Sequence, residues 1–323
     1  MKNIAVVYGG YSSEYEISVK SGRNVAAELR KAGFNVYEVL LTRESWDVVD
    51  ADRRYSVSKD DFSAVIGGER VHFDKVFIIV HGDPGENGLL QAYFEMLQIP
   101  FMGCSSLVDS VSFDKYFCKR ALADLPEVRM AADVRLLKGR GFEPEEIVAK
   151  LGLPVFVKPC NGGSSFGVTK VKKTEDLPSA VEYAFSENAD SVLIESAISG
   201  REIDCAVYTG NDGKARALPL LEIVSQNEFF DYEAKYLGAS QELCPAPVDA
   251  VVTAKVQRAA VEIFEHLGCR DLVRMDFIVS PDGEVFFLEV NPNPGMTAES
   301  IVPKMVAAAG IRMEDFLADL ANR

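Results

Sequence analysis

One segment, residues 274–291, constrains the fold of this chain more than any other: RMDFIVSPDGEVFFLEVN. Two apolar runs flank the dipeptide Asp282-Gly283, which is typical of the two-residue turn of a β-hairpin. Because side chains alternate between the two faces of a strand, a hairpin here separates its charged residues from most of its apolar ones. The sequence therefore predicts a β-hairpin with one polar face.

The register of this hairpin follows from its turn. If the turn has two residues, Asp276 lies opposite Glu289, and Arg274 lies opposite Asn291. The other face is apolar and should pack on the core. It would carry Met275, Phe277 and Val279 from the first strand and Val290, Leu288 and Phe286 from the second.

The paired carboxylates are a candidate metal site. Carboxylates directly across a ladder lie about 5 Å apart and repel each other unless a positive charge is present. The oxygens of Asp276, Glu289 and Asn291 suit Mg²⁺, which bridges carboxylates and nucleotide phosphates. An exposed hairpin face on which Arg274 neutralises Asp276 explains the same residues equally well. Both interpretations stay open from these residues alone.

Length and charge limit the class of protein. A chain of 323 residues, 48% of them hydrophobic, exceeds one compact core, so two or three domains are expected. The formal net charge of -15 argues against nucleic acid and anionic membranes as partners. We find no membrane span and no signal peptide, and the six cysteines have no paired spacing. These features predict a cytoplasmic protein with reduced thiols.

The predicted elements divide the chain into three domains. Residues 1–105 alternate apolar strands with helical segments, which predicts an α/β domain with a doubly wound parallel sheet. Residues 106–193 contain two strands, at 155–158 and 168–171, joined by a glycine-rich loop that would form a flap. Residues 194–323 are mainly strands, and the irregular stretch at about 225–245 is long enough to be a lid.

Two N-terminal loops lie where ligands bind in doubly wound sheets, beyond the carboxyl ends of the strands. The first contains Glu14, which could bind a substrate ammonium. However, Ser13 and Glu16 fit a helix capping box, and Glu14 could simply complement the helix dipole. The second loop begins with His81, which suits acid-base chemistry, although a hydrogen-bonded loop histidine is the commoner case.

Three further segments carry candidate binding groups. Lys158 precedes the loop 160–167, whose amides could surround a phosphate, although glycine-rich hairpins without function are common. Residues 231–236, DYEAKY, would also suit a solvated loop. Thr297 predicts a helix cap with Ser300 in the first turn, where free amides suit a carboxylate. Taken alone, each segment is explained equally well or better by a purely structural role: a glycine-rich hairpin, a solvated loop or an ordinary capped helix.

Five segments occur together in an order known from one family: GGYSSEYEIS, HGDPGENG, KPCNGGSSFG, DYEAKY and RMDF to LEVNPNPGMT. Over essentially its whole length the chain resembles the D-alanine:D-alanine ligases of the ATP-grasp superfamily. The resemblance implies two ATP-grasp subdomains that clamp a nucleotide. It also implies ATP-dependent synthesis of D-alanyl-D-alanine through D-alanyl phosphate, with release of ADP and phosphate, for peptidoglycan precursors.

The resemblance implies roles around the first D-alanine. Glu14 would hold its ammonium, with His81 nearby. Ser164 and Tyr236 would form a hydrogen-bonded set with Glu14 that closes the lid. Relatives that accept D-lactate as second substrate lack this tyrosine, so Tyr236 predicts D-alanine.

The resemblance also implies an oxyanion site, formed by Arg274 and the amide of Gly295. Ser300, beside Ile301, would bind the carboxylate of the second D-alanine. Leucine is usual at position 301, and Asn161-Gly162 replaces the usual charged pair in the flap.

The implied nucleotide site binds ATP together with two Mg²⁺ ions, for which Mn²⁺ could substitute. Lys115 could equally be a solvated helix lysine, and Glu195 and Glu202 could be strand-end charges. The metal ligands would be Asp276, Glu289 and Asn291. The ATP-binding residues would be Lys115, Lys158, Ser164, Glu195, Glu202 and Lys235.

A homodimer is implied by the resemblance alone. Two other functions remain open: an ATP-grasp ligase that joins a different carboxylate and amine, and a nucleotide-binding regulator without turnover. The intact Arg274, Lys235 and Tyr236 argue against the regulator.

Overall fold

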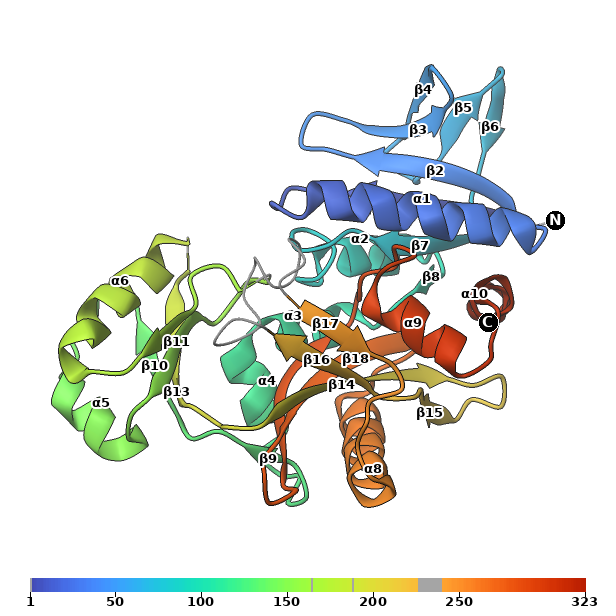
Figure 1. The fold of residues 1–323 in the computed structure, drawn as a ribbon. Coiled ribbons are helices and arrows are strands. Elements are labelled where there is room, and N and C mark those ends of the chain that lie inside the picture. The colour runs from blue at the N-terminus through green and yellow to red at the C-terminus, as the bar shows by residue number, and fades with distance from the viewer. Residues whose placement is uncertain (1, 164, 188, 226–239) are drawn as a thin grey trace.

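The chain folds into three main β-sheets with helices packed around them (Figure 1). The computed structural model describes residues 2–163, 165–187, 189–225 and 240–323. Within these ranges no helix is both long and apolar enough to cross a membrane. All six cysteines are free and five are buried, as expected. The predicted α/β class is confirmed.

The first sheet has the strand order β4-β3-β2-β1-β7-β8, in which β2, β1, β7 and β8 are parallel. Helix α1 packs on one face, against Ile4 and Val6, and α2 packs on the other face, near Ala5 and Val7. The doubly wound arrangement agrees with the prediction, whereas β3 to β6 were not predicted. The bounds are β1 Asn3–Gly9, α1 Tyr15–Lys31, β2 Asn35–Leu41, β3 Trp46–Asp50, β4 Arg53–Ser56, β5 Ala64–Ile66, β6 Glu69–Val71, β7 Lys75–Ile79, α2 Leu89–Leu97 and β8 Phe101–Met102.

The second sheet has the order β10-β13-β11-β12 and is covered on one face by α5 and α6. Strands β11 and β12 pair antiparallel, so the predicted flap is a hairpin of this sheet. Helices α3 and α4 connect it to the first sheet. The bounds are α3 Ser106–Phe113, α4 Lys115–Ala121, β10 Asp133–Leu137, α5 Pro144–Leu151, β11 Val155–Pro159, β12 Thr169–Val171, the 3₁₀ helix Thr174–Asp176, α6 Leu177–Ser186 and β13 Ser191–Ser196.

The third sheet has seven strands in the order β17-β16-β14-β18-β19-β9, with β15 paired to β14. Helix α8 covers its apolar face, while α9 and α10 join the core around α1 (Figure 1). The sequence at 217–224 predicts a single strand, whereas the structure has two, β15 and β16. The bounds are β9 Arg129–Met130, β14 Arg201–Thr209, β15 Ala215–Ala217, β16 Leu221–Ser225, β17 Ser240–Leu243, α8 Ala250–Leu267, β18 Leu272–Val279, β19 Val285–Asn291, α9 Ile301–Ala308 and α10 Met313–Asn322.

The hairpin β18–β19 forms, but its turn is longer than predicted. The amide of Ser280 donates to the carbonyl of Glu284 (2.9 Å), which leaves three residues in the loop. A three-residue loop shifts the register by one, and a β-bulge at Leu288 shifts it back. Asp276 therefore lies opposite Glu289 as predicted, but only because the bulge, which was not predicted, offsets the longer loop.

The bulge changes which residues reach the core. Phe277 pairs with Phe287, and both side chains are buried against α8. The prediction that Leu288 and Phe286 face the core with Phe277 is wrong, because Leu288 is the extra residue of the bulge and lines a cavity.

Sheet membership does not follow chain order strictly. Strand β9 precedes the second sheet in sequence but pairs with β19 of the third. The domain boundaries at 105 and 193 stay predictions.

Close packing of α1 on β1 generates a stability prediction at Gly22. A Cβ atom there would lie 2.5 Å from both Cβ and Cγ of Tyr8, whose ring is buried and whose hydroxyl donates to Glu38. Helix propensity alone favours Gly22→Ala by about 1 kcal/mol, whereas overpacking costs roughly 1–3 kcal/mol. We expect the free energy of unfolding to fall in urea titrations. The exposed substitution Lys20→Ala on the same helix should change it by less than about 0.5 kcal/mol. A more stable Gly22→Ala protein would contradict this packing.

Candidate active site

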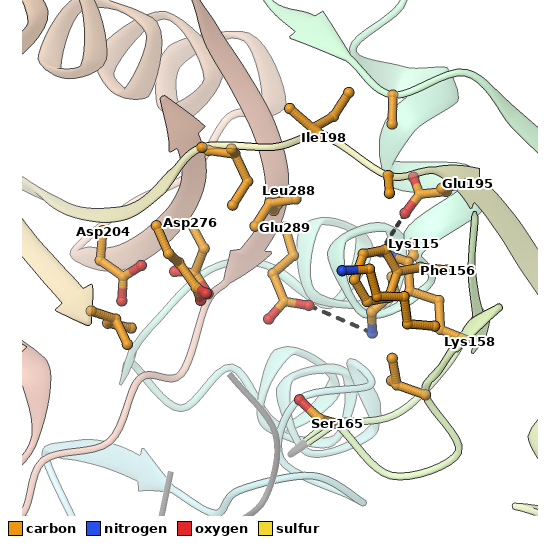
Figure 2. Close-up of a pocket in the computed structure, with 18 of the residues that line it drawn as sticks. Lys115, Phe156, Lys158, Ser165, Glu195, Ile198, Asp204, Asp276, Leu288 and Glu289 are labelled. Atoms are coloured by element: carbon orange, nitrogen blue, oxygen red, sulfur yellow. Dashed lines mark ion pairs between the residues drawn. The ribbon is translucent and has the colours of Figure 1, made fainter. Parts of the chain in front are cut away.

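A cavity of about 600 Å³ lies between the flap hairpin and the third sheet (Figure 2). This volume falls within the range of small-molecule sites. Phe156, Ile198 and Leu288 give it apolar walls. Seven of the predicted site residues line it: Lys115, Lys158, Glu195, Glu202, Arg274, Asp276 and Glu289.

Glu195 binds two lysines at one end of the cavity. Its Oε1 lies 2.5 Å from Nζ of Lys119, and its Oε2 lies 2.5 Å from Nζ of Lys158. Burial would raise the pKa of Glu195, but Lys158 and Lys119 lower it below its ordinary value. Burial likewise opposes the charge of Lys158, but Glu195 raises the pKa of that lysine. Lys158 therefore presents a fixed positive charge, which suits a phosphate.

Three carboxylates form a row at the other end of the cavity, across β14, β18 and β19. Asp204 pairs in register with Asp276, and Asp276 pairs with Glu289 (Figure 2). Arg274 binds Asp276 through both Nε (2.7 Å) and Nη2 (2.9 Å), and Asn291 donates to the same carboxylate (3.1 Å). The predicted positions of Arg274 and Asn291 are thus confirmed.

This face is not an exposed charged surface. Asp276 is 5% exposed and Asp204 is 0% exposed, so both charges are buried. Burial lowers the pKa of Arg274, but Asp276, Asp204 and Glu289 together raise it well above its ordinary value. Lys115 lies 3.6 Å from Glu289. Basic side chains therefore neutralise the carboxylates in this structure.

The donor set fits Mg²⁺. Two carboxylates and an amide oxygen are hard ligands, and Mg²⁺ typically takes one or two carboxylates together with phosphate and water. Among the described residues, no three His, Cys, Asp or Glu side chains form a metal-binding group. The protein alone thus offers a partial coordination shell, which a nucleotide phosphate would complete.

Glu14 lies beside the flap. A Cβ atom on Gly163 would be 3.3 Å from Oε2 of Glu14. The predicted capping box is wrong: α1 begins at Tyr15, and Glu14 occupies the N-cap position without a side-chain cap bond. Ser12 instead accepts from the Glu14 amide (3.2 Å), so capping does not occupy the Glu14 carboxylate. Three predicted residues lie outside the described ranges: Ser164, Lys235 and Tyr236.

His81 supports the turn that contains Gly295. The ring is 4% exposed, with Nδ1 3.2 Å from the carbonyl of Asn293 and Nε2 3.1 Å from Oγ of Ser21. The same Ser21 oxygen accepts from the amide of Met296 (3.2 Å). The structure thus brings His81 to the segment of the predicted oxyanion donor, with both ring nitrogens already engaged.

Ser300 lies next to Gly295. A Cβ atom on Gly295 would be 3.0 Å from Oγ of Ser300. The prediction that Thr297 caps a helix is wrong, because α9 begins at Ile301 with Ser300 at its N-cap. Residues 297–300 form a turn in which the Thr297 amide donates to Oγ of Ser300 (3.0 Å). Ile301 is half-buried against the core around α1.

Two residues of the site, Lys119 and Asp204, were not predicted from the sequence. Lys119 follows Lys115 by one helical turn, a spacing that places both on one face of α4. Asp204 follows Glu202 by two positions on β14, which places both on one face of that strand. These spacings were visible in the sequence, but the partners of each residue were not.

Lys119 generates a stability prediction. It is 3% exposed and contacts Glu195 (2.5 Å), Asp133 (2.9 Å) and the carbonyl of Ala131 (2.8 Å). Lys119→Met leaves buried carboxylates short of a partner and should lower the free energy of unfolding by about 3–5 kcal/mol. The control is Arg120→Met, which removes a more exposed partner of Asp133 and should cost at most about 1 kcal/mol.

The loss at Lys119 should depend on pH. A carboxyl group with a lowered folded pKa stabilises the protein above its unfolded pKa and loses that effect as the pH falls. Lys119→Met removes one of the two lysines that lower the pKa of Glu195. The difference in stability between this variant and the unchanged protein should therefore shrink as the pH falls below about 4.3. Chemical denaturation at several pH values measures this. Equal losses for both variants, or a pH-independent loss, would disprove the assigned network.

Two family models match the chain. D-ala D-ala ligase N-terminus matches residues 3–104, and D-ala D-ala ligase C-terminus matches residues 125–322. Among curated relatives, D-alanine–D-alanine ligase of Azobacteroides pseudotrichonymphae is 44% identical over 324 residues, covering 99% of both chains. That of Parabacteroides distasonis is 42% identical over 320 residues, covering 99% of this chain and 96% of the relative.

Solved structures agree with these matches. The VanG D-Ala:D-Ser ligase from Enterococcus faecalis superposes with a TM-score of 0.87 at 33% identity, covering 99% of this chain and 98% of that chain. D-alanyl-alanine synthetase A from Vibrio cholerae gives a TM-score of 0.88 at 28% identity, with the same coverage. With both halves of the sequence matched, this chain belongs to the D-alanine–D-alanine ligase family.

Proposed function

We propose that this chain is an ADP-forming D-alanine:D-alanine ligase that supplies D-alanyl-D-alanine for peptidoglycan precursors. One observation carries the proposal. A single cavity of nucleotide size is lined by Lys115 and Lys158 and by Asp276 and Glu289, so cations suited to phosphate face carboxylates suited to a metal ion. Family membership identifies the reaction class that uses this arrangement.

In the proposed reaction, a carboxylate oxygen of the first D-alanine attacks the γ-phosphorus of ATP, the bond from that phosphorus to the β-γ bridging oxygen breaks, and ADP leaves. Lys115 and Lys158 hold the phosphates, and Lys235 the transferred group. Mg²⁺ bound by Asp276, Glu289 and Asn291 would neutralise phosphate charge, and we propose two such ions, for which Mn²⁺ can substitute. Glu195 and Glu202 orient the adenosine; Glu195 also fixes Lys158.

The neutral amine of the second D-alanine then attacks the carbonyl carbon of the acyl phosphate; the nitrogen loses a proton to solvent, and the bond from carbon to the phosphate oxygen breaks, so that phosphate leaves from the tetrahedral intermediate. Arg274 and the amide of Gly295 stabilise the oxyanion. Ser300 and Ile301 place the second D-alanine, next to Gly295. Glu14 holds the ammonium of the first.

The flap, with Ser164, and the segment that contains Tyr236 exclude water from the acyl phosphate. His81 fixes the turn beside the reacting atoms. Its contacts with Asn293 and Ser21 are consistent with a role in positioning this turn.

D-serine is the alternative second substrate, because one similar solved structure is named a D-Ala:D-Ser ligase. We propose D-alanine on the strength of Tyr236. We also propose a cytoplasmic homodimer. The highly exposed Leu89, Met96 and Leu107 on α2 and α3, between 61% and 77% exposed, support a contact between two copies.

The activity is tested by adding D-alanine, ATP and Mg²⁺ to the purified chain. We expect ADP release stimulated by D-alanine and a product with the mass of D-alanyl-D-alanine. D-serine or D-lactate added with D-alanine should yield little mixed product. Stimulation by a different amino acid would indicate another ATP-grasp ligase, and ATP binding without any dipeptide would indicate a regulator.

The metal ligands are tested by Asp276→Asn and Glu289→Gln. Both keep the side-chain shape and remove a hard anionic ligand, so turnover should fall roughly 100-fold or more, with folding retained in circular dichroism. Asp282→Asn is the matched control, because Asp282 lies exposed in the turn of the same hairpin. Near-normal turnover of either ligand variant would refute the assignment.

A further inference from the structure

We propose that Arg274 exchanges partners when a divalent cation binds: it leaves Asp276 and binds Asp204, which is therefore a positioning residue for both the metal and the oxyanion site. This inference rests on the proposed function, because it takes Asp276 as a metal ligand and Arg274 as an oxyanion donor.

Asp276 already has strong partners in this structure. Arg274 contacts both of its oxygens, at 2.7 and 2.9 Å, and Asn291 donates to one of them at 3.1 Å. A bidentate guanidinium is among the strongest partners of a carboxylate. A divalent cation on these oxygens would compete for them and repel the guanidinium. Metal binding therefore requires Arg274 to move.

Asp204 is the carboxylate to which Arg274 can move. Its Nε lies 3.6 Å from Oδ2 of Asp204, the residue directly across the ladder from Asp276. Both aspartates line the same cavity (Figure 2), and Asp204 has no exposed surface. Arg274 is only partly exposed, with 17% of its side-chain surface accessible, so losing its counter-ion is unfavourable and the nearest buried carboxylate determines the new position.

The exchange prepares both groups for chemistry. On Asp204, Arg274 remains a neutralised donor within the same cavity, while Asp276 becomes available as a hard ligand. Asp204 thus holds the proposed oxyanion donor in place when the metal is bound. Without Asp204, Arg274 would stay on Asp276 and oppose the metal.

The test is a double-mutant cycle on metal affinity, measured with Mn²⁺ by electron paramagnetic resonance in the presence of ADP, so that no turnover is needed. Asp204→Asn should raise the Mn²⁺ dissociation constant about 10- to 100-fold, the usual effect of losing a residue that orients metal ligands. Arg274→Met removes the competitor and should tighten Mn²⁺ binding. In the Arg274→Met background, Asp204→Asn should then have little further effect.

Two results would overturn the exchange. One is an effect of Asp204→Asn that persists undiminished in the Arg274→Met background, since Asp204 would then act on the metal directly. The other is unchanged Mn²⁺ affinity in Asp204→Asn. Asp47→Asn is the matched control for general charge loss. Asp47 is buried on β3 of the first sheet, does not line the cavity, and accepts from Ser45 (2.6 Å) and Ser56 (3.2 Å), so its loss should leave affinity within about two-fold.

If Arg274→Met does not fold, a crystal structure with Mn²⁺ and ADP decides the question. Arg274 in contact with Asp204 supports the exchange, and Arg274 still bidentate on Asp276 beside a bound metal refutes it. Dipeptide formation by the unchanged chain tests the proposed function separately. A chain that forms the dipeptide but fails the cycle would retain its function and lose only this inference.

Discussion

Neutralisation of the carboxylate row formed by Asp204, Asp276 and Glu289 is the constraint on which the rest of the site depends. These side chains lie on adjacent strands, and the two aspartates are almost fully buried. Buried carboxylates at such spacing require positive charge. Arg274 and Lys115 provide it in this structure, and a metal-nucleotide complex would replace part of it. The opposite face of the same strands is apolar and packs on α8, which keeps the row rigid.

The polar face of the hairpin could be predicted from the sequence because alternation of side chains is a local property. The predicted turn was one residue too short, yet the pairing of Asp276 with Glu289 was correct, because the bulge at Leu288 compensates for the longer loop. Burial preserves the register on which both faces depend. The prediction failed for the residues between the bulge and the turn: Val285, Phe286, Phe287 and Leu288.

Other features could not be predicted because they depend on contacts distant in sequence. Asp204 joins the row only because β14 pairs with β18, and strand order is not a local pattern. Lys119 gained its importance from Glu195, which lies 76 residues away. The edge strand β4 is mostly exposed and has no apolar run to signal it. The predicted capping box at Ser13 does not form, because α1 begins at Tyr15 and the hydroxyl of Ser12 accepts from the amide of Glu14.

The most direct test of the central claim is an anomalous difference map from crystals of the chain grown with Mn²⁺ and ADP. We predict a peak at about 2.0–2.3 Å from carboxylate oxygens of both Asp276 and Glu289, and adjacent to a phosphate. A bound nucleotide with no peak between these residues, or with the metal held elsewhere, would contradict the account.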